Sequence, residues 1–389
     1  MNGFIGIIAE DRPALLIGLL GILKSGNPFV PINPTFPKDR INYIIGDCGI
    51  TAILTDQDNY ETAREIAKIN RLVKHIVCID DVTNGETNIG LGKNNEQKDV
   101  GDTCYVIYTS GSTGKSKGVP ITHRHLIPEF YWFRDYMGLD LWNRVMQNLS
   151  YTFDFGVFEI FTTLLFGSSL YVVDKKKVGD FGLYSRFINM HSIDTAHSTP
   201  AFFNSVVSLG EKMPSLKVVH LGGERLTGNI VNSICAVVSP GCKIHNGYGP
   251  TEATINCSIY TLTAGQCESI DDSANIPIGR PTVLHRLYIL DRNLRPMPEG
   301  MAGELCIAGA GLASGYLNNP ELTAEKFKRS SGSDKTYILY KTGDLARWLR
   351  DSLPAGGTTK GIIEFLGRID HQVKIRGYRI ELGEIESCL

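Results

Sequence analysis

The chain has 389 residues, of which 42% are hydrophobic and 21% charged, and its formal net charge is −2. This composition is typical of a globular protein and excludes a disordered, collagen-like or coiled-coil chain. The balanced charge argues against binding to nucleic acid or to an anionic membrane surface. The longest apolar run, Ala14 to Leu23, is too short to span a bilayer. The nine cysteines include no CxxC pair, so we expect neither a disulfide framework nor a zinc site. Cysteines of this kind suit a reducing compartment, so we expect a cytoplasmic location.

Strand-like and helix-like segments alternate through the first part of the chain. The predicted strands are Phe4–Ala9, Pro28–Ile32, Ala52–Thr55, His75–Ile79 and Cys104–Tyr108, and the predicted helices are Arg12–Ser25, Arg40–Cys48 and Tyr60–Ile69. Such alternation predicts βαβ units around a largely parallel sheet, so the expected fold class is α/β. From Ile276 onward, short strands separated by glycine and proline predict a smaller β-rich subdomain; they are Leu287–Leu290, Gly303–Ala308 and Gly361–Leu366.

A segment dense in glycine, hydroxyl and lysine side chains, Tyr108–Gly118, follows one of these strands directly. Glycines allow a close approach of the backbone to a ligand, and hydroxyls and lysines can bind phosphate oxygens, so the segment predicts a polyphosphate cradle. A Walker A loop would have glycine where Thr109 stands, five positions before Gly114, so a P-loop kinase or ATPase fits poorly. The other alternative is a plain solvated turn.

The same segment resembles the signature loop of the adenylate-forming, AMP-binding superfamily. Further segments resemble that superfamily's other motifs in order; they are Arg12–Pro34, Asn148–Asp154 with Glu159, Leu221–Glu224, Asn246–Glu252, Gly303–Leu317, Tyr340–Asp344 and Gly367–Glu386. Their order and spacing are similar to those of adenylation domains of non-ribosomal peptide synthetases. The resemblance implies that residues 1–369 form the AMP-binding adenylation core. This core would contain large βαβ-layered subdomains and one small β-rich subdomain. A hinge and the first strands of a small C-terminal domain would then occupy residues 370–389.

The function implied by this resemblance is ATP-dependent activation of an amino acid as an aminoacyl-adenylate, with release of pyrophosphate. The implied cofactors are ATP and Mg²⁺. The implied partners are the amino acid, a phosphopantetheinyl carrier protein that accepts the product as a thioester, and neighbouring synthetase domains. Two alternatives stay open: an acyl-CoA or aryl-acid ligase of the same superfamily, and an inactive nucleotide-binding remnant.

The resemblance also assigns roles around the nucleotide. The phosphates would contact Thr109, Ser110, Gly111, Ser112, Thr113, Gly114, Lys115 and Lys117. Adenine would lie against Tyr248, the Asn246 amide and the backbone of Gly222, Gly223 and Glu224. Thr251 would bind the α-phosphate and Glu252 the Mg²⁺, while Asp344 and Arg368 would hold the ribose and Asp370 would be the hinge. Thr251, Glu252, Lys115 and Lys117 are the expected catalytic residues.

The expected substrate pocket is formed by Asp154, Phe155, Phe158, His197, His220, Gly222, Gly247, Ile255 and Asn256. Asp154 would pair with the α-ammonium group, and the two glycines would leave space along one wall. Two imidazoles and an amide predict a polar side chain, Glu-like first and then Gln or a hydroxylated residue. The alternative is that one or both histidines point away and bind backbone groups.

Three further expectations concern glycines and chain ends. Gly309, Gly311 and Gly315 are interpreted as a glycine-dense turn and not as a dinucleotide fingerprint. The resemblance implies that the family's N-terminal segment and most of its small domain, with a substrate-binding lysine, are missing, so the chain would be weakly active or inactive. Lys374–Leu382 would pair as a hairpin or fray.

Overall fold

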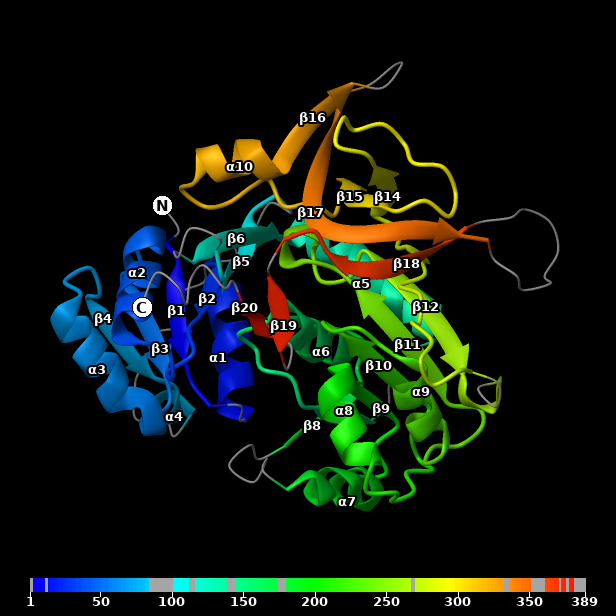
Figure 1. Ribbon diagram of the computed structural model, residues 1–389. Helices are drawn as coiled ribbons and strands as arrows, with labels where there is room; N and C mark the ends of the chain where they lie inside the picture. Colours follow the sequence, from blue (N-terminus) through cyan, green and yellow to red (C-terminus); the bar gives the residue numbers. More distant parts are fainter. Residues whose placement is uncertain are drawn as a thin grey trace.

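The structure, a computed structural model, describes residues 3–10, 13–83, 101–111, 116–138, 144–173, 180–266, 270–331, 336–350, 361–370, 372–375 and 378–380. These residues form three large sheets and a two-stranded ribbon. Figure 1 shows three lobes, one for each large sheet, coloured blue, green and yellow to orange along the chain. The predicted α/β class is confirmed. Among the described residues, no helix has the length and apolar character needed to cross a bilayer.

The first sheet has the strand order β4-β3-β1-β2-β5-β6. Its strands are β1 (Ile5–Ile8), β2 (Phe29–Pro31), β3 (Ala52–Thr55), β4 (His75–Cys78), β5 (Thr103–Thr109) and β6 (Lys117–Thr122). Its helices are α1 (Pro13–Lys24), α2 (Lys38–Cys48), α3 (Tyr60–Ile69) and the short α4 (Ile79–Thr83). All neighbours pair in parallel except β5 and β6, which are antiparallel. The glycine-rich segment therefore connects two strands, whereas a Walker A loop opens a helix, and the P-loop alternative is wrong.

The second sheet has the order β13-β12-β11-β10-β9-β7-β8. Its strands are β7 (Arg144–Gln147), β8 (Ser169–Val172), β9 (Thr195–Ser198), β10 (Val218–Gly222), β11 (Lys243–Tyr248), β12 (Ser258–Thr263) and β13 (Arg280–Pro281). Its helices are α5 (His123–Met137), α6 (Asp154–Leu165), α7 (Phe181–His191), α8 (Pro200–Val207) and α9 (Gly228–Cys235). The strands from β8 to β11 are parallel, and β12 and β13 add antiparallel strands at one edge.

The two faces of this sheet are covered by different helices. Side chains of α7, α8 and α9 pack on one face in a separate hydrophobic cluster with Val219, Leu221 and Ile244. On the opposite face, Phe133 of α5 and Phe158 of α6 lie 5.9 and 5.6 Å, between ring centroids, from His220 of β10. Side chains alternate between the two faces along a strand. The residues that alternate with Val219, Leu221 and Ile244, including the predicted pocket histidines, therefore lie on this second face.

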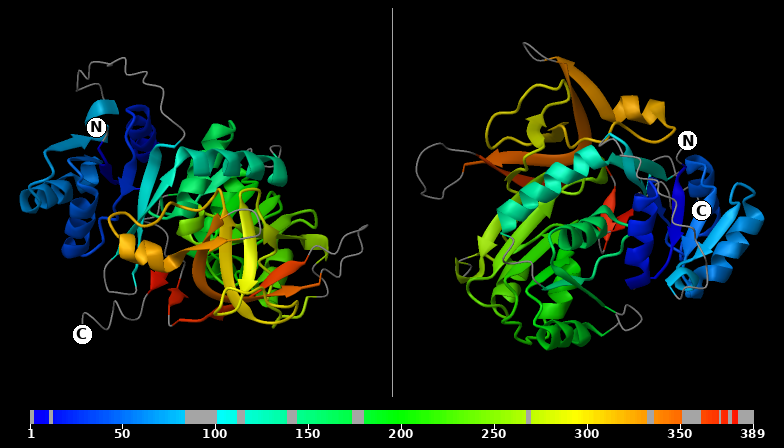
Figure 2. Two further views of the ribbon diagram at one scale, coloured as in Figure 1. Left: turned by 90° about the horizontal axis from the view of Figure 1, so that it is seen from above. Right: turned by 180° about the vertical axis from the view of Figure 1, so that it is seen from behind.

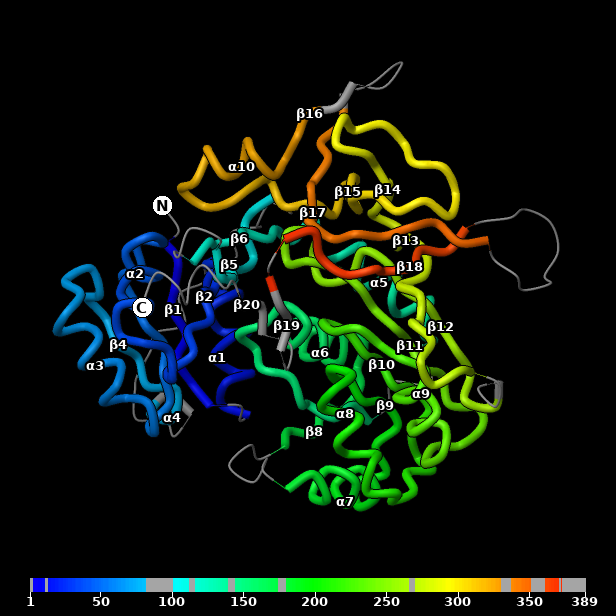
Figure 3. The backbone as a smooth tube through the Cα atoms, in the orientation of Figure 1, coloured from blue at the N-terminus to red at the C-terminus, as the bar shows by residue number. Residues whose placement is uncertain are grey.

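The third sheet is antiparallel, with the order β14-β15-β17-β16 and with β18 paired to β17. Its elements are β14 (His285–Leu290), β15 (Gly303–Gly309), α10 (Pro320–Lys326), β16 (Phe327–Ser331), β17 (Thr336–Leu349) and β18 (Ile362–Arg368). A hairpin of β19 (Val373–Ile375) and β20 (Tyr378–Ile380) follows, which is one of the two predicted outcomes; residues 376–377 and 381–382 of the predicted segment lie outside the described residues. In the described part of the chain, short 3₁₀ helices lie at Gln57–Asn59, Thr251–Ala253 (η4) and Ala264–Gln266. Figure 3 shows the same lobes as a continuous tube in chain order.

One hydrophobic cluster joins the three lobes. It contains Phe29 and Tyr105 from the first sheet, Phe133 and Phe158 from helices α5 and α6, and Ile307 from β15. The Phe29 and Tyr105 rings lie 5.6 Å apart, and the Phe133 and Phe158 rings 4.8 Å apart. Burying such side chains contributes about 1.5–3 kcal/mol each. This shared core packs the three lobes against one another, and Figure 2 shows the lobes side by side in two further views.

The second and third sheets also meet through their backbones. Ile278 N–H donates to the Ile363 carbonyl at 2.8 Å, and Ile363 N–H donates to the Gly279 carbonyl at 2.9 Å. Gly279 has φ +82°, and a Cβ built on it would lie 1.9 Å from the Ile259 carbonyl oxygen. Glycine is therefore required at this junction both by the backbone angle and by the lack of space.

We predict that Gly279→Ala lowers the free energy of unfolding by more than about 3 kcal/mol, because the backbone must shift where the two sheets meet. Gly49→Ala is the matched control: Gly49 also has positive φ, +65°, but no atom lies within 4 Å of its built Cβ. The control should lose only about 1 kcal/mol. Urea unfolding of both variants measures the difference, and equal losses would contradict the tight junction.

Candidate active site

The glycine-rich segment carries two buried hydroxyls, one at the end of β5 and one just before β6. Thr109 ends β5, and its register partner is Lys117, the first residue of β6. The Thr109 and Ser116 hydroxyl oxygens are buried and have no hydrogen-bond partner among the described residues. Buried polar atoms without partners are uncommon, so these two hydroxyls fit a polar ligand such as phosphate. Ser110 and Gly111 are buried in the same segment, whereas the predicted Ser112, Thr113, Gly114 and Lys115 lie outside the described residues.

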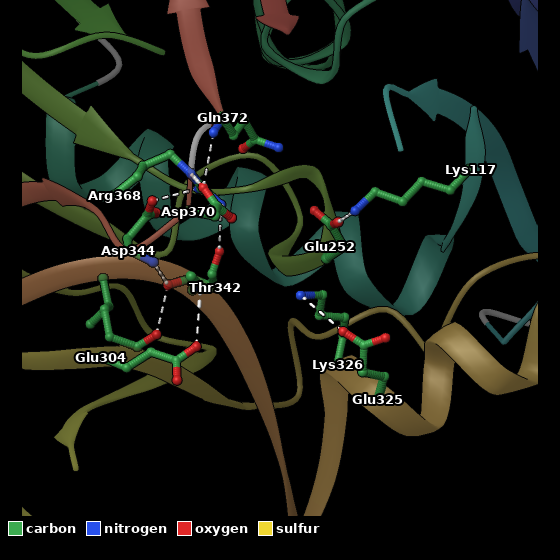
Figure 4. Close-up of polar contacts among 12 residues, drawn as sticks. Lys117, Glu252, Glu304, Glu325, Lys326, Thr342, Asp344, Arg368, Asp370 and Gln372 are labelled. Atoms are coloured by element: carbon green, nitrogen blue, oxygen red, sulfur yellow. Dashed lines mark hydrogen bonds and ion pairs between the residues drawn. The ribbon is translucent and has the colours of Figure 1, made fainter. Parts of the chain in front are cut away.

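A buried ion pair connects this segment to the end of the second sheet. Lys117 Nζ lies 3.1 Å from Glu252 Oε1, and the two side chains are 5% and 0% exposed. Figure 4 shows the lysine reaching toward the carboxylate from the strand opposite. Tyr316 completes a triangle: its hydroxyl donates to Glu252 Oε1 at 2.8 Å and accepts from Lys117 Nζ at 3.2 Å. Opposite charges can be buried together when they are paired and hydrogen-bonded in this way.

The surroundings of Glu252 fit a Mg²⁺–nucleotide ligand. Mg²⁺ is typically held by one or two carboxylates together with phosphate oxygens and water. Within the described part of the chain, no group of three or more His, Cys, Asp and Glu side chains could hold a metal by itself. A single carboxylate such as Glu252 therefore fits a metal ion only when phosphate oxygens and water supply the other ligands. Thr251, which precedes it at the start of η4, is only partly buried.

A second polar network links the predicted adenine, ribose and hinge residues. Asp344 accepts hydrogen bonds from the Tyr248 hydroxyl through one oxygen and from Arg368 Nη1, at 2.6 Å, through the other. Arg368 also contacts both carboxylate oxygens of Asp370 at 2.6 Å. Burial and the Asp344 charge hold the pKa of Tyr248 well above its usual value, so its hydroxyl stays protonated as a donor. In Figure 4, Asp344, Arg368 and Asp370 lie together, apart from Lys117 and Glu252.

Two predicted adenine contacts have partners within the protein. The Asn246 amide nitrogen donates to the carbonyls of Ile276 and Pro277 at 3.2 and 2.8 Å, so its amide N–H groups hold the chain crossing to the third sheet. The carboxylate of Glu224 accepts from Ala201 N–H at 3.1 Å in the first turn of α8. Gly223 is exposed with φ +84°, a conformation that suits glycine.

The register of the second sheet brings most of the predicted pocket together. His197, His220 and His245 are register partners on β9, β10 and β11, and Gly222 pairs with Gly247 one step further along the same face. Phe155 of α6 lies 5.8 Å from the His197 ring and 4.9 Å from the His220 ring. The partly buried Asp154 begins the same helix, and its charge contributes to the raised pKa of the buried Tyr105 phenol.

The expectation that two glycines leave space in the pocket is wrong. A Cβ built on Gly247 would lie 2.5 Å from His220 Nε2 and 2.7 Å from Asn256 Oδ1, and one on Gly222 would lie 3.3 Å from the Phe155 ring. The side chains of Phe155, His220 and Asn256 therefore occupy the volume that the missing Cβ atoms leave. The glycines allow these side chains to pack closely on the sheet.

The pocket histidines are hydrogen-bonded to each other, a contact that the sequence did not predict. His197 Nδ1 and His220 Nδ1 lie 3.2 Å apart, so one nitrogen donates and the other accepts. Both side chains are fully buried, and burial lowers the pKa of His197 to about 3 and that of His220 well below its usual value. The pair is thus neutral at physiological pH. It offers hydrogen bonds to a ligand, but no positive charge.

The backbone between the ion pair and the pocket adopts unusual angles. Thr254 and Ile255 have φ values of +50° and +73°, a region that a β-branched residue rarely adopts. The Thr254 hydroxyl donates to the Gly311 carbonyl at 2.7 Å, and Ala313 N–H donates to the Glu252 carbonyl at 2.9 Å. Such local strain persists only where surrounding contacts enforce it, and it is common at active sites.

Comparisons with known proteins show the family of this chain. The profile of the AMP-binding enzyme family matches residues 2–317. The chain belongs to the AMP-binding enzyme family. It is 38% identical over 389 residues to bacitracin synthase 1 of Bacillus licheniformis and 37% identical over 389 residues to gramicidin S synthase 2 of Brevibacillus brevis. These alignments cover 99% and 100% of this chain but 7% and 8% of the two relatives.

Solved structures of related proteins share the fold of this AMP-binding enzyme. A fused adenylation–PCP di-domain, NpsA-ThdA from Klebsiella oxytoca, superposes with a TM-score of 0.81 at 25% identity and covers 99% of this chain and 72% of that one. The Vibrio cholerae adenylation domain AlmE also has a TM-score of 0.81, at 23% identity, covering 99% and 74%.

Two residues of this AMP-binding enzyme were not predicted as site residues. His245 lies beside His220 with ring centroids 6.1 Å apart, and its Nδ1 hydrogen-bonds the Thr261 hydroxyl at 2.8 Å. Its position two residues before Gly247 on one strand was the available signal, since alternate residues share a face. Tyr316 lies within the motif Gly303–Leu317, but no local pattern indicated its role, because its contact with Glu252 spans 64 residues.

We predict that His245→Gln makes the protein less sensitive to acid. Burial, with a smaller contribution from Lys243, lowers the pKa of His245 to about 3. The unfolded chain, with a pKa of about 6.5, therefore takes up a proton below that pH that the native state does not, and stability falls as the pH falls. Between pH 7 and pH 5 this histidine should account for about 2 kcal/mol of the loss.

Urea unfolding of the wild type and of His245→Gln at both pH values measures this loss. The exposed His75 provides the control, because His75→Gln should lose stability in parallel with the wild type. An unchanged pH dependence in His245→Gln would show that its imidazole is not held neutral in the native state.

Proposed function

We propose that this chain activates an amino acid with ATP, forming an aminoacyl-adenylate and releasing pyrophosphate. The observation that carries the proposal is the buried Lys117–Glu252 pair, which joins a hydroxyl-lined glycine-rich segment to a carboxylate suited to Mg²⁺. The similarity to bacitracin and gramicidin S synthases over at least 99% of the chain supports an amino acid as the acid component. The whole relatives are far longer, so their complete activities are not carried over.

The proposed reaction needs positioning and charge stabilisation more than covalent chemistry. A substrate carboxylate oxygen attacks the α-phosphorus of ATP. The new O–P bond of the acyl phosphate forms, and the bond from the α-phosphorus to the pyrophosphate oxygen breaks. Lys117 and the Thr109 hydroxyl would contact the leaving pyrophosphate, and the Thr251 hydroxyl the α-phosphate. Mg²⁺ bound by Glu252 and the phosphates would neutralise charge on the leaving group. Tyr248 and Asp344 would hold adenine and ribose at the other end.

We propose a polar α-amino acid as the substrate. The Asp154 carboxylate, at the start of α6, would pair with the α-ammonium group, which a fatty or aryl acid lacks. The His197–His220 pair and Asn256 would contact the side chain, and burying them against an aliphatic group would cost about 1–3 kcal/mol for each lost hydrogen bond. Glutamate was the first expectation. Because the imidazoles are neutral, a glutamine-like amide is equally well supported, with a hydroxylated residue as the next possibility.

The remaining assignments extend this proposal. The aminoacyl group of the adenylate would be transferred to the phosphopantetheine thiol of a carrier protein, with release of AMP. Neighbouring synthetase domains would be further partners. Residues 1–369 would form the adenylation core, and residues 370–389 would contain the hinge at Asp370 and the first strands of a small domain. A cytoplasmic location suits a reaction that consumes ATP.

Amino-acid-dependent exchange of labelled pyrophosphate into ATP tests the proposed function. Across the common amino acids, we predict that glutamate or glutamine stimulates exchange most strongly. Asp154→Asn should lower kcat/KM by about 10²-fold or more, because the α-ammonium loses its counter-charge. Asp135→Asn is the control, since Asp135 is an exposed residue paired with Arg134 on the surface. Stimulation by leucine, valine or phenylalanine would refute the polar pocket, and stimulation by fatty or aryl acids alone would refute amino-acid activation.

A further inference from the structure

The glycine-dense turn at residues 309–318 contacts both halves of the proposed phosphate site. Ala313 N–H donates to the Glu252 carbonyl, and Leu317 N–H donates to the Gly118 carbonyl, both at 2.9 Å. Tyr316 lies between these two contacts and meets Glu252 and Lys117 with its hydroxyl. This turn, which we name the strap (residues 309–318), is therefore bonded to η4 on one side and to β6 on the other.

The Tyr316 side chain is itself firmly held. The backbone N–H of Tyr316 donates to the Thr323 hydroxyl at 2.9 Å, and the tyrosine ring packs edge-on against Phe327 at 5.6 Å between centroids. Gly315, just before it, has φ +139°, and a Cβ there would lie 2.4 Å from Thr323 Cγ2. The tyrosine is thus fixed by α10 and β16 of the third sheet, independently of the two charged residues that it contacts.

The hydroxyl has a definite hydrogen-bond polarity. A phenol is protonated at neutral pH, because the ordinary pKa of tyrosine is about 10. It therefore donates its single proton to Glu252 Oε1 and accepts from the Lys117 ammonium. A neutral donor at Oε1 fixes the carboxylate's orientation without neutralising it, whereas an additional cation there would compete with a metal.

We propose that Tyr316 is a positioning residue that orients Glu252 and Lys117 for the Mg²⁺–polyphosphate end of ATP. The proposal rests on the proposed function, because it assumes that Glu252 holds the metal ion. It gives the strap a role that its glycine spacing alone did not indicate. The adenine and ribose end, formed by Tyr248 and Asp344, has its own hydrogen bonds and does not depend on Tyr316.

Calorimetric binding of Mg²⁺·ATP and of AMP, without turnover, tests this role in Tyr316→Phe. The variant keeps the ring and removes only the hydroxyl, so we expect Mg²⁺·ATP to bind about tenfold more weakly, as for loss of one hydrogen bond to a charged group. The affinity for AMP, which lacks the β- and γ-phosphates, should change less than twofold. Tyr184→Phe, at an equally buried tyrosine in the second sheet's outer core, is the matched control and should change neither affinity.

A double-mutant cycle with Glu252→Gln separates positioning from general loosening. Because the phenol acts through Glu252, adding Tyr316→Phe to Glu252→Gln should weaken Mg²⁺·ATP binding by less than twofold more. Equal weakening of AMP and Mg²⁺·ATP by Tyr316→Phe, no weakening of either, or full additivity in the cycle would each overturn the inference. A wild-type chain that binds no Mg²⁺·ATP would instead overturn the proposed function, and the inference with it.

Discussion

The buried contact between Lys117 and Glu252 is the constraint on which the site depends. A lysine and a glutamate can be removed from water together only when each has its partner and further hydrogen bonds, and losing one partner typically costs about 3–5 kcal/mol. Lys117 comes from the first sheet, Glu252 from the end of the second, and Tyr316 from the third. The three lobes must therefore be correctly placed for this pair to be satisfied. The shared hydrophobic core supplies that placement.

The second network solves a similar problem at the other end of the site. Asp344 lies on β17 of the third sheet and Tyr248 on β11 of the second, and their hydrogen bond joins the two sheets beside the predicted nucleotide. Arg368 extends the network to Asp370, so the residue expected to act as a hinge is bonded to the residue expected to hold the ribose. A movement about Asp370 would change its hydrogen bonds with Arg368.

Much of the local structure follows from sequence patterns, whereas contacts between lobes do not. The strand Ala52–Thr55 and the helix Tyr60–Ile69 have the predicted ends, because hydrophobic periodicity and turn residues are local signals. The family resemblance assigned Lys117 and Glu252 to one phosphate site, and the structure brings their side chains into contact. The prediction of free space over Gly247 was wrong because His220 and Asn256 fill it. Their positions depend on strand register and on the path of the chain at Asn256, which local patterns do not give. The role of Tyr316 was missed because its contact with Glu252 joins segments that are 64 residues apart.

A crystal structure of the chain with Mg²⁺, a non-hydrolysable ATP analogue and the preferred amino acid would test the account most directly. The account predicts adenine against Tyr248, ribose hydroxyls at Asp344, the polyphosphate beside Lys117, and a metal ion shared between Glu252 and phosphate oxygens. The Tyr316 hydroxyl should remain within hydrogen-bond distance of the Glu252 carboxylate. A nucleotide bound elsewhere, or one bound here with its metal ion away from Glu252, would contradict it.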